Sequence, residues 1–153
     1  MKPLLLALGL ALVTSCASTD DRSEFVTDVY TQLWSGGKTE VALEAYTGNF
    51  RWTENLTTHD GGPSAYLEFI SVYRTAFPDL EFAVKDTFSS GDRTAVRWVA
   101  TGTNTGSLLG AKPTGKPAIV RGITIYRMEG DLAAEEWTTW DEAGMMRQLG
   151  LGK

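Results

Sequence analysis

The stretch that decides the fold is PSAYLEFISVYRTAFPDLEFAVKDTFSSGDRTAVRWVA, residues 63–100. Its first half has large apolar residues at helical spacing, from Tyr66 to Phe77, and Pro78 ends that helix. Beyond Pro78 the period becomes two, because Leu80, Phe82 and Val84 alternate with polar residues. The stretch therefore predicts a long amphipathic helix followed by an antiparallel hairpin that turns at residues 89–92.

The same patterns extend to both sides of this stretch. Upstream, residues 25–34 predict one helix, 40–46 a second short one, 50–56 a strand and 57–62 a polar loop. Downstream, residues 119–128 and 132–140 predict two further strands joined by a tight turn, and 142–149 a final helix. Helices followed by four consecutive antiparallel strands indicate an α+β fold, in which a curved antiparallel sheet wraps a long helix as a cone.

The first residues are typical of a bacterial lipoprotein signal peptide. Lys2 precedes an apolar run from Leu4 to Val13, which is shorter than the about 20 residues that a membrane span needs. Val13-Thr14-Ser15-Cys16 resembles the lipobox, whose cysteine is lipidated and becomes the new N-terminus. We therefore predict a signal peptide at 1–15, lipidated Cys16 with a tether to 23, and one domain at 24–153. A plain secretory signal that contains a cysteine is the alternative.

Composition excludes several functions. The net charge of −5 becomes more negative once the lysine-bearing signal is removed, so a nucleic-acid partner is not expected. Cys16 is the single cysteine, so no intramolecular disulfide can form. The chain also has a single histidine, and one histidine with a lipidated cysteine cannot build a metal site, so none is expected. Neither a GxGxxG motif nor a P-loop occurs, and we expect no cofactor.

An ordered set of short motifs resembles the SnoaL-like polyketide cyclases, also called ester cyclases, within the nuclear transport factor 2-like superfamily. The residues that carry this resemblance run in order from Gly62 to Gly150: Ala76–Leu80, Gly91–Arg93, Val96–Trp98, Gly102–Gly106, Gly110, Pro113–Lys116, Gly122–Ile123, Tyr126–Arg127, Glu136–Trp137, Trp140–Asp141 and Gln148–Gly150. The resemblance implies a conical α+β barrel with the active site in its mouth. It also implies an intramolecular aldol condensation that closes a ring, with Asp141 at the position of the family's general acid/base.

Asp141 has a chemical case of its own. Trp137, Thr139 and Asp141 share one strand face, and a carboxylate among indoles has a raised pKa that suits proton abstraction next to a carbonyl. The alternative is that Asp141 caps the helix that starts at Glu142. Asn104 stands where the family has histidine, so it could donate a hydrogen bond to an enolate but not shuttle a proton. His59, the one histidine, lies in the polar loop and is a third catalytic candidate.

Five further residues are candidates for the ligand pocket. Asn55 ends the first predicted strand, where it is either a polar pocket residue or a turn residue. Arg127 matches a family arginine, and Glu136 is its candidate partner. Trp52, Trp98 and Trp137 are candidates for the pocket lining, although tryptophan is most often a core residue.

Three classes of function remain open. The first is an enzyme that performs acid/base chemistry on a small apolar carbonyl compound, by aldol cyclisation, isomerisation or hydrolysis. The second is a non-catalytic module that binds such a ligand at the cell envelope, with the membrane as partner through Cys16. The third is a structural module that forms a homodimer through its open sheet face. The outer membrane is the expected location in a Gram-negative host.

Overall fold

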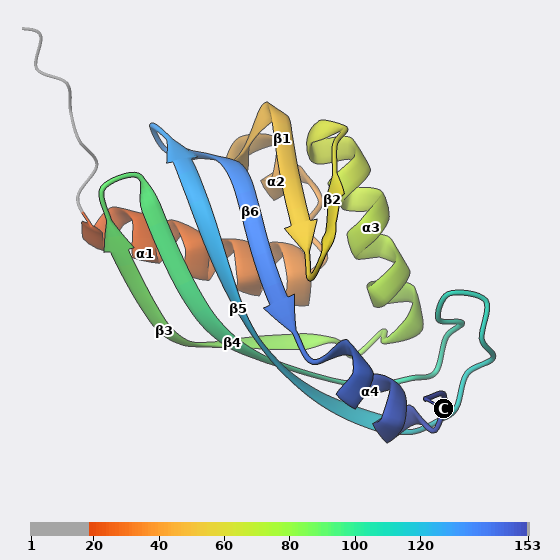
Figure 1. Cartoon of the computed structure of the whole chain (residues 1–153). Coiled ribbons are helices and arrows are strands. Elements are labelled where there is room, and N and C mark those ends of the chain that lie inside the picture. Colours follow the sequence, from red (N-terminus) through yellow and green to blue (C-terminus); the bar gives the residue numbers. More distant parts are fainter. Residues whose placement is uncertain (1–18, 153) are drawn as a thin grey trace, which may run out of the picture.

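The computed structural model describes residues 19–152. The predicted signal peptide and Cys16 lie outside these residues. The described part forms five helical segments and six strands, shown in Figure 1: α1 (Thr19–Asp28), η1 (Val29–Ser35), α2 (Glu40–Ala45), β1 (Tyr46–Glu54), β2 (Thr57–His59), α3 (Gly62–Ala76), β3 (Glu81–Ser90), β4 (Arg93–Thr103), β5 (Pro117–Glu129), β6 (Leu132–Trp140) and α4 (Glu142–Leu149). None of the described helices is long and apolar enough to cross a membrane.

The six strands form one curved sheet in the order β2-β1-β6-β5-β4-β3. The meander from β3 to β6 is antiparallel, which confirms the four consecutive strands read from the sequence. Two features were not predicted. β1 pairs with β6 in parallel, and residues 57–59, expected in a polar loop, add β2 to the edge of β1. The sheet is therefore mixed, whereas an antiparallel one was expected.

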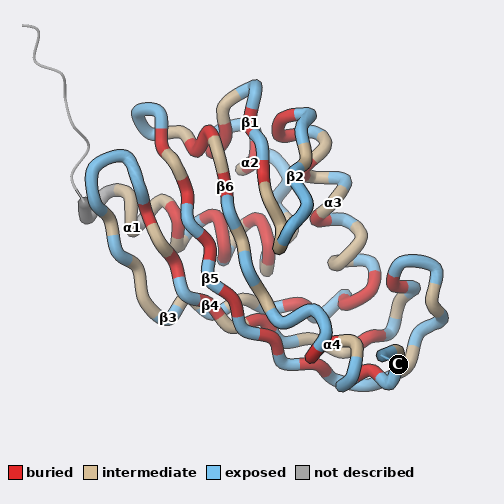
Figure 2. The backbone as a smooth tube through the Cα atoms, in the orientation of Figure 1, coloured by how far each residue is buried: buried red, intermediate tan, exposed pale blue. Residues whose placement is uncertain are grey.

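Helices cover one face of this sheet, and the hydrophobic core lies between the helices and that face (Figures 1 and 2). α1 and η1 follow each other as one continuous helical segment that buries Val26, Val29, Tyr30 and Leu33 against the strands. This segment begins at Thr19, inside the predicted tether. α3 buries Tyr66 and Ile70 on the same side, as its helical spacing predicted.

Alternation along the strands separates an inner from an outer face (Figure 2). On β5 the even-numbered residues from Ala118 to Met128 are buried, and the odd-numbered ones are exposed or half-buried. On β6, which pairs with β5, Glu136 points to the inner face and Trp137 to the outer one. The position of a residue in this alternation therefore decides whether its side chain points into the interior.

The loop from 104 to 116 and helix α4 close one end of the sheet (Figure 1). Asn104 is fully buried at the base of this loop. α4 packs against β5, where Gln148 exchanges two hydrogen bonds with the backbone of Ile119, at 2.9 and 3.0 Å. This end of the sheet is thus bounded by a loop and a helix that the sequence placed correctly in order.

Candidate functional site

A cavity of about 80 Å³ lies between the inner face of the sheet, η1 and α3. Its walls are mainly aromatic, and the rings that line it are Tyr30, Trp34, Trp52, Phe69, Tyr73, Phe77, Phe82, Trp98 and Trp140. Among the described residues that line the cavity, the charged groups are two glutamates, Glu54 and Glu136. A mostly apolar pocket with a few convergent polar groups is the usual form of a small-molecule site.

Glu136 is the deepest charged group of the pocket, and its side chain is almost fully buried, at 5% exposure. Its Oε2 accepts a hydrogen bond from the Tyr66 hydroxyl at 2.8 Å, and its Oε1 accepts one from Thr138 Oγ1 at 2.7 Å. Burial disfavours the charged form and raises the pKa of Glu136 to about 7, although the hydroxyl groups of Thr138, Tyr66 and Tyr126 oppose this rise. The carboxyl group therefore exchanges its proton near neutral pH.

A chain of hydrogen bonds leads to Glu136 from the opposite wall of the pocket. Thr124 Oγ1 accepts from the Tyr30 hydroxyl at 2.6 Å and from Trp98 Nε1 at 3.0 Å. Because that oxygen already has two donors, its own proton points along the 2.7 Å contact to Thr138 Oγ1. Thr138 in turn donates to Glu136. The donors of this chain therefore point toward Glu136, and the last of them, Thr138, favours its charged form.

Glu54, the last residue of β1, is the second carboxyl group of the pocket and is less deeply buried. Its Oε1 accepts from Trp140 Nε1 at 2.7 Å and from the Tyr73 hydroxyl at 3.3 Å. No hydrogen bond of a described residue reaches Oε2. Burial raises the pKa of Glu54, and the negative charge of Glu142 adds to this rise.

The structure brings two of the three predicted tryptophans into the pocket wall. Trp98 lies so close to β5 that a Cβ at Gly122 would stand 2.2 Å from its ring, so glycine is required there. Trp52 also lines the pocket and is stacked on His59, with ring centroids 4.9 Å apart. The Trp52 Nε1–H is buried without a hydrogen-bond partner among the described residues.

Asp141 does not face the pocket, so its predicted placement is corrected. Its carboxylate caps α4 by accepting a hydrogen bond from the Gly144 N–H at 2.7 Å. The side chain is 63% exposed and lies 3.9 Å from Arg147. Glu136, Thr138 and Trp140 occupy the inner face of β6, so the face shared by Trp137 and Thr139 is the outer one. The alternative that Asp141 is a helix cap describes its observed position.

Asn104, the second catalytic candidate, is buried but also turned away from the pocket. Its Nδ2 donates to the carbonyl oxygens of Ala76 and Gly106, and its Oδ1 accepts from the backbone N–H and hydroxyl of Thr114. All of its hydrogen-bonding groups thus hold the 104–116 loop. No group of Asn104 is left to bind an enolate oxygen.

His59 and Asn55 lie at the β1–β2 hairpin, beside the pocket but outside its lining. The imidazole of His59 stacks on the indole ring of Trp52. Asn55 adopts a left-handed backbone conformation, with φ of 50°, and its Oδ1 accepts from the Trp140 N–H at 3.2 Å. Of the two expectations for Asn55, the turn residue describes its position.

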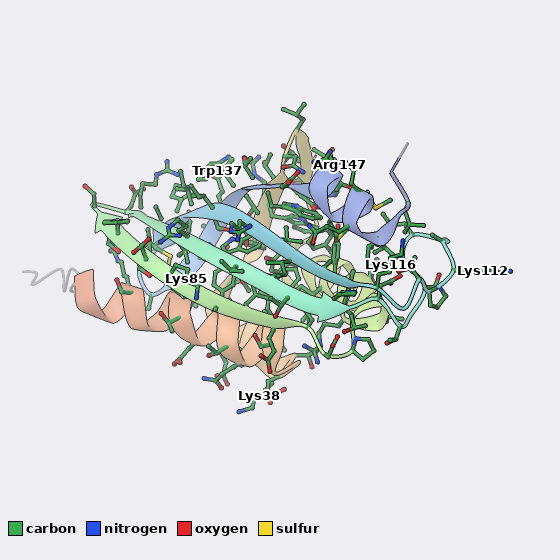
Figure 3. The ribbon with its side chains drawn as sticks, turned by 90° about the horizontal axis from the view of Figure 1, so that it is seen from below. Lys38, Lys85, Lys112, Lys116, Trp137 and Arg147 are labelled. Atoms are coloured by element: carbon green, nitrogen blue, oxygen red, sulfur yellow. The ribbon has the colours of Figure 1, made fainter. Side chains whose placement is uncertain are left out.

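Trp137 and Arg127 lie on the outer face of the sheet, which corrects their expected place in the pocket. Figure 3 shows Trp137 on the side of the sheet away from α1, and the guanidinium of Arg93 lies 4.8 Å from its ring centre. Arg127 pairs with Glu135 at 3.0 Å and Glu129 at 2.8 Å, rather than with Glu136. Four of the predicted polar site residues therefore do not line the pocket: Asp141, Asn104, Asn55 and His59.

Sequence reasoning missed both carboxyl groups of the pocket, although the sequence pattern around Glu54 could have identified that residue. Glu54 follows Trp52 by two residues on one strand, so a pocket-lining Trp52 implies a pocket-facing Glu54. Glu136 gave a weaker signal. The alternation of β6 defines two faces, but the sequence does not state which face is internal.

Comparisons with known proteins agree on one family. Residues 24–149 match the model of the SnoaL-like polyketide cyclases. Three solved structures share the fold. A candidate SnoaL-like polyketide cyclase from Jannaschia is 23% identical with a TM-score of 0.80, and the match covers 88% of this chain and 95% of that one. A candidate polyketide cyclase from Acidithiobacillus ferrooxidans is 25% identical with a TM-score of 0.76, covering 91% and 99%.

The third structure is a protein with a ketosteroid isomerase-like fold from Catenulispora acidiphila, in complex with trimethylamine. It is 15% identical with a TM-score of 0.71, and the match covers 84% of this chain and 93% of that one. No protein of curated function matches the chain. The α+β fold of the nuclear transport factor 2-like and ketosteroid isomerase-like type is thus confirmed. Because the family model matches residues 24–149, which are most of this chain, the chain belongs to the SnoaL-like polyketide cyclase family.

Proposed function

We propose that this chain is an exported, lipid-anchored cyclase-type protein that transfers a proton on a small apolar carbonyl compound. The observation that carries the proposal is Glu136, an almost fully buried carboxyl group in the pocket wall with a pKa of about 7. A general acid/base is most effective when its pKa lies near the working pH. We place this role on Glu136 instead of Asp141, because the Asp141 carboxylate caps α4.

The proposed chemistry begins when the Glu136 carboxylate takes a proton from the carbon next to the carbonyl group. In an aldol closure, the resulting enolate carbon bonds to a second carbonyl carbon of the same molecule, and the new alkoxide oxygen takes the proton back from Glu136. In an isomerisation, the proton returns to another carbon. Burial raises the pKa of Tyr66 well above its usual value, so its hydroxyl stays protonated and holds the carboxylate in place.

The test is proton exchange rather than turnover of one particular substrate. Small ketones such as cyclohexanone and acetophenone are incubated in deuterium oxide with the domain that starts after Cys16, and exchange at the α-carbon is followed by NMR. We expect Glu136→Gln to lower the catalysed rate by roughly 10² to 10⁴-fold, the usual contribution of a general base. Asp141→Asn, which retains a capping side chain, should leave the rate unchanged.

A second candidate is ligand binding without turnover. It is favoured by the hydrogen bonds from Tyr66 and Thr138, which take one acceptor position on each oxygen of Glu136 and leave fewer for a substrate proton. The fold relative from Catenulispora acidiphila, which holds trimethylamine, is consistent with a small ligand in such a pocket. Binding of the ketones without exchange at any pH from 6 to 9 would support this candidate and overturn the first.

A further inference from the structure

We propose that the pocket recognises an ammonium group, held at Glu54 between the rings of Phe69, Tyr73 and Trp140. This inference rests on the proposed function only in using the same pocket, and it adds the chemical class of the ligand. The Glu54 carboxylate is fixed through Oε1 by Trp140 and Tyr73, while Oε2 has no hydrogen-bond partner among the described residues. Because Glu54 is less buried than Glu136, it marks the more accessible end of the pocket.

Three aromatic rings that line the pocket lie next to one another beside Glu54. Phe69 and Tyr73 lie edge to face, with centroids 5.3 Å apart and an interplanar angle of 68°. Tyr73 and Trp140 lie 5.9 Å apart at 83°. In each pair the edge of one ring meets the face of the other, and all three rings line the pocket that Glu54 also lines. Since aromatic rings attract cations, a pocket wall that combines these rings with a carboxylate is suited to a tertiary or quaternary ammonium group.

The charge of the pocket supports the same class of ligand. Its described lining contains Glu54 and Glu136 and no lysine, arginine or histidine. Neither glutamate forms an ion pair with a described residue. His59 is the basic group that acts electrostatically on Glu54, and Glu142 opposes it. A buried carboxylate without a counter-charge is costly, so a cation that enters the pocket recovers part of that cost.

The two glutamates would then contact different parts of the ligand. An ammonium group at Glu54 leaves the remaining apolar part of the ligand to extend along Trp52 and Phe69 toward Glu136. The inferred ligand is therefore a small apolar amine, whose proton-labile carbon lies apart from its charge. A neutral compound of the same shape lacks the interaction with Glu54 and should bind more weakly.

The test compares choline with 3,3-dimethylbutan-1-ol, which replaces the quaternary nitrogen by carbon and keeps the shape. Binding of each to the domain is measured by isothermal titration calorimetry, with tryptophan fluorescence as a second readout. We expect at least a tenfold preference for choline. Glu54→Gln, which keeps an oxygen for the Trp140 N–H, should reduce the preference to less than threefold. Glu44→Gln on the exposed face of α2 removes the same charge elsewhere and should leave it unchanged.

Equal or tighter binding of the neutral alcohol to the unmodified domain would overturn the inference, and so would an undiminished preference in Glu54→Gln. The proposed function fails independently of these results. If ketone exchange is absent while choline is still preferred, the ammonium site stands and proton transfer is rejected. If exchange depends on Glu136 while the two probes bind equally, proton transfer stands and the ammonium site is rejected.

Discussion

At the scale of single residues, nearly complete burial distinguishes Glu136 from the other acids whose burial the structure describes. Glu135, its neighbour on β6, points outward, where hydrogen bonds from Arg127 lower its pKa. Glu136 points inward, where burial raises its pKa to about 7 although its hydroxyl donors oppose the rise. Adjacent positions on one strand therefore have opposite electrostatic behaviour, because alternation places one in solvent and one in the interior.

This burial predicts a pH-dependent stability that belongs to one side chain. The pKa of Glu136 is higher in the folded state than its ordinary value of 4.5. Its contribution to stability is therefore fully present below about pH 4.5 and is lost as the pH rises through about 7. We expect Glu136→Gln to remove about 3 kcal/mol of this decline between pH 4.5 and 8. Urea unfolding of both proteins across this range measures the difference, and parallel pH profiles would contradict the prediction.

The side chains of the candidate site were only partly predictable. A period of two identified Trp52 and Trp98 as inward-facing, since large apolar neighbours on their strands fixed the parity. On β6 both faces carry tryptophan, Trp137 on one and Trp140 on the other, so hydrophobicity did not decide which face is buried. Asp141 was predicted from the family resemblance, and the ambiguous parity of β6 gave no reason to prefer Glu136.

At the scale of elements, the hydrophobic period located the helices and the meander, because both depend on contacts close in sequence. The parallel pairing of β1 with β6 joins residues such as Trp52 and Glu136, which lie far apart in the sequence. No local pattern specifies such a partner. The short strand β2 was read as a loop for the related reason that its three residues are polar and pair only at the edge.

The position of Asp141 at the start of α4 gives a prediction for that helix. Loss of an N-cap side chain costs about 1 kcal/mol, whereas asparagine caps as well as aspartate. We expect Asp141→Ala to lower the free energy of unfolding by about 1 kcal/mol and Asp141→Asn to leave it nearly unchanged, as measured by urea denaturation at pH 7. Both variants should retain the binding of pocket ligands. Loss of proton exchange in a stably folded Asp141→Asn would instead return the catalytic role to Asp141.

At the scale of the whole molecule, the two faces of the sheet have different surroundings. The inner face forms the pocket with η1 and α3, while the outer face exposes Ile119, Ile123, Ile125 and Trp137. The homodimer suggested by an open sheet face stays a prediction. The lining of the pocket lies on the opposite face of the sheet from these exposed residues.

The location of the molecule depends on residues before the described domain, and it gives the last prediction. If Val13-Thr14-Ser15-Cys16 is a lipobox, the full chain produced in a bacterium with a lipoprotein pathway should incorporate an alkyne-tagged fatty acid and sediment with the membranes. Cys16→Ala should abolish both labelling and membrane association, because one apolar signal of this length does not span a bilayer. A cleaved, unlabelled protein released in soluble form would instead identify a plain secretory signal. That result would move the pocket from the membrane surface to the surrounding solution and leave its chemistry unchanged.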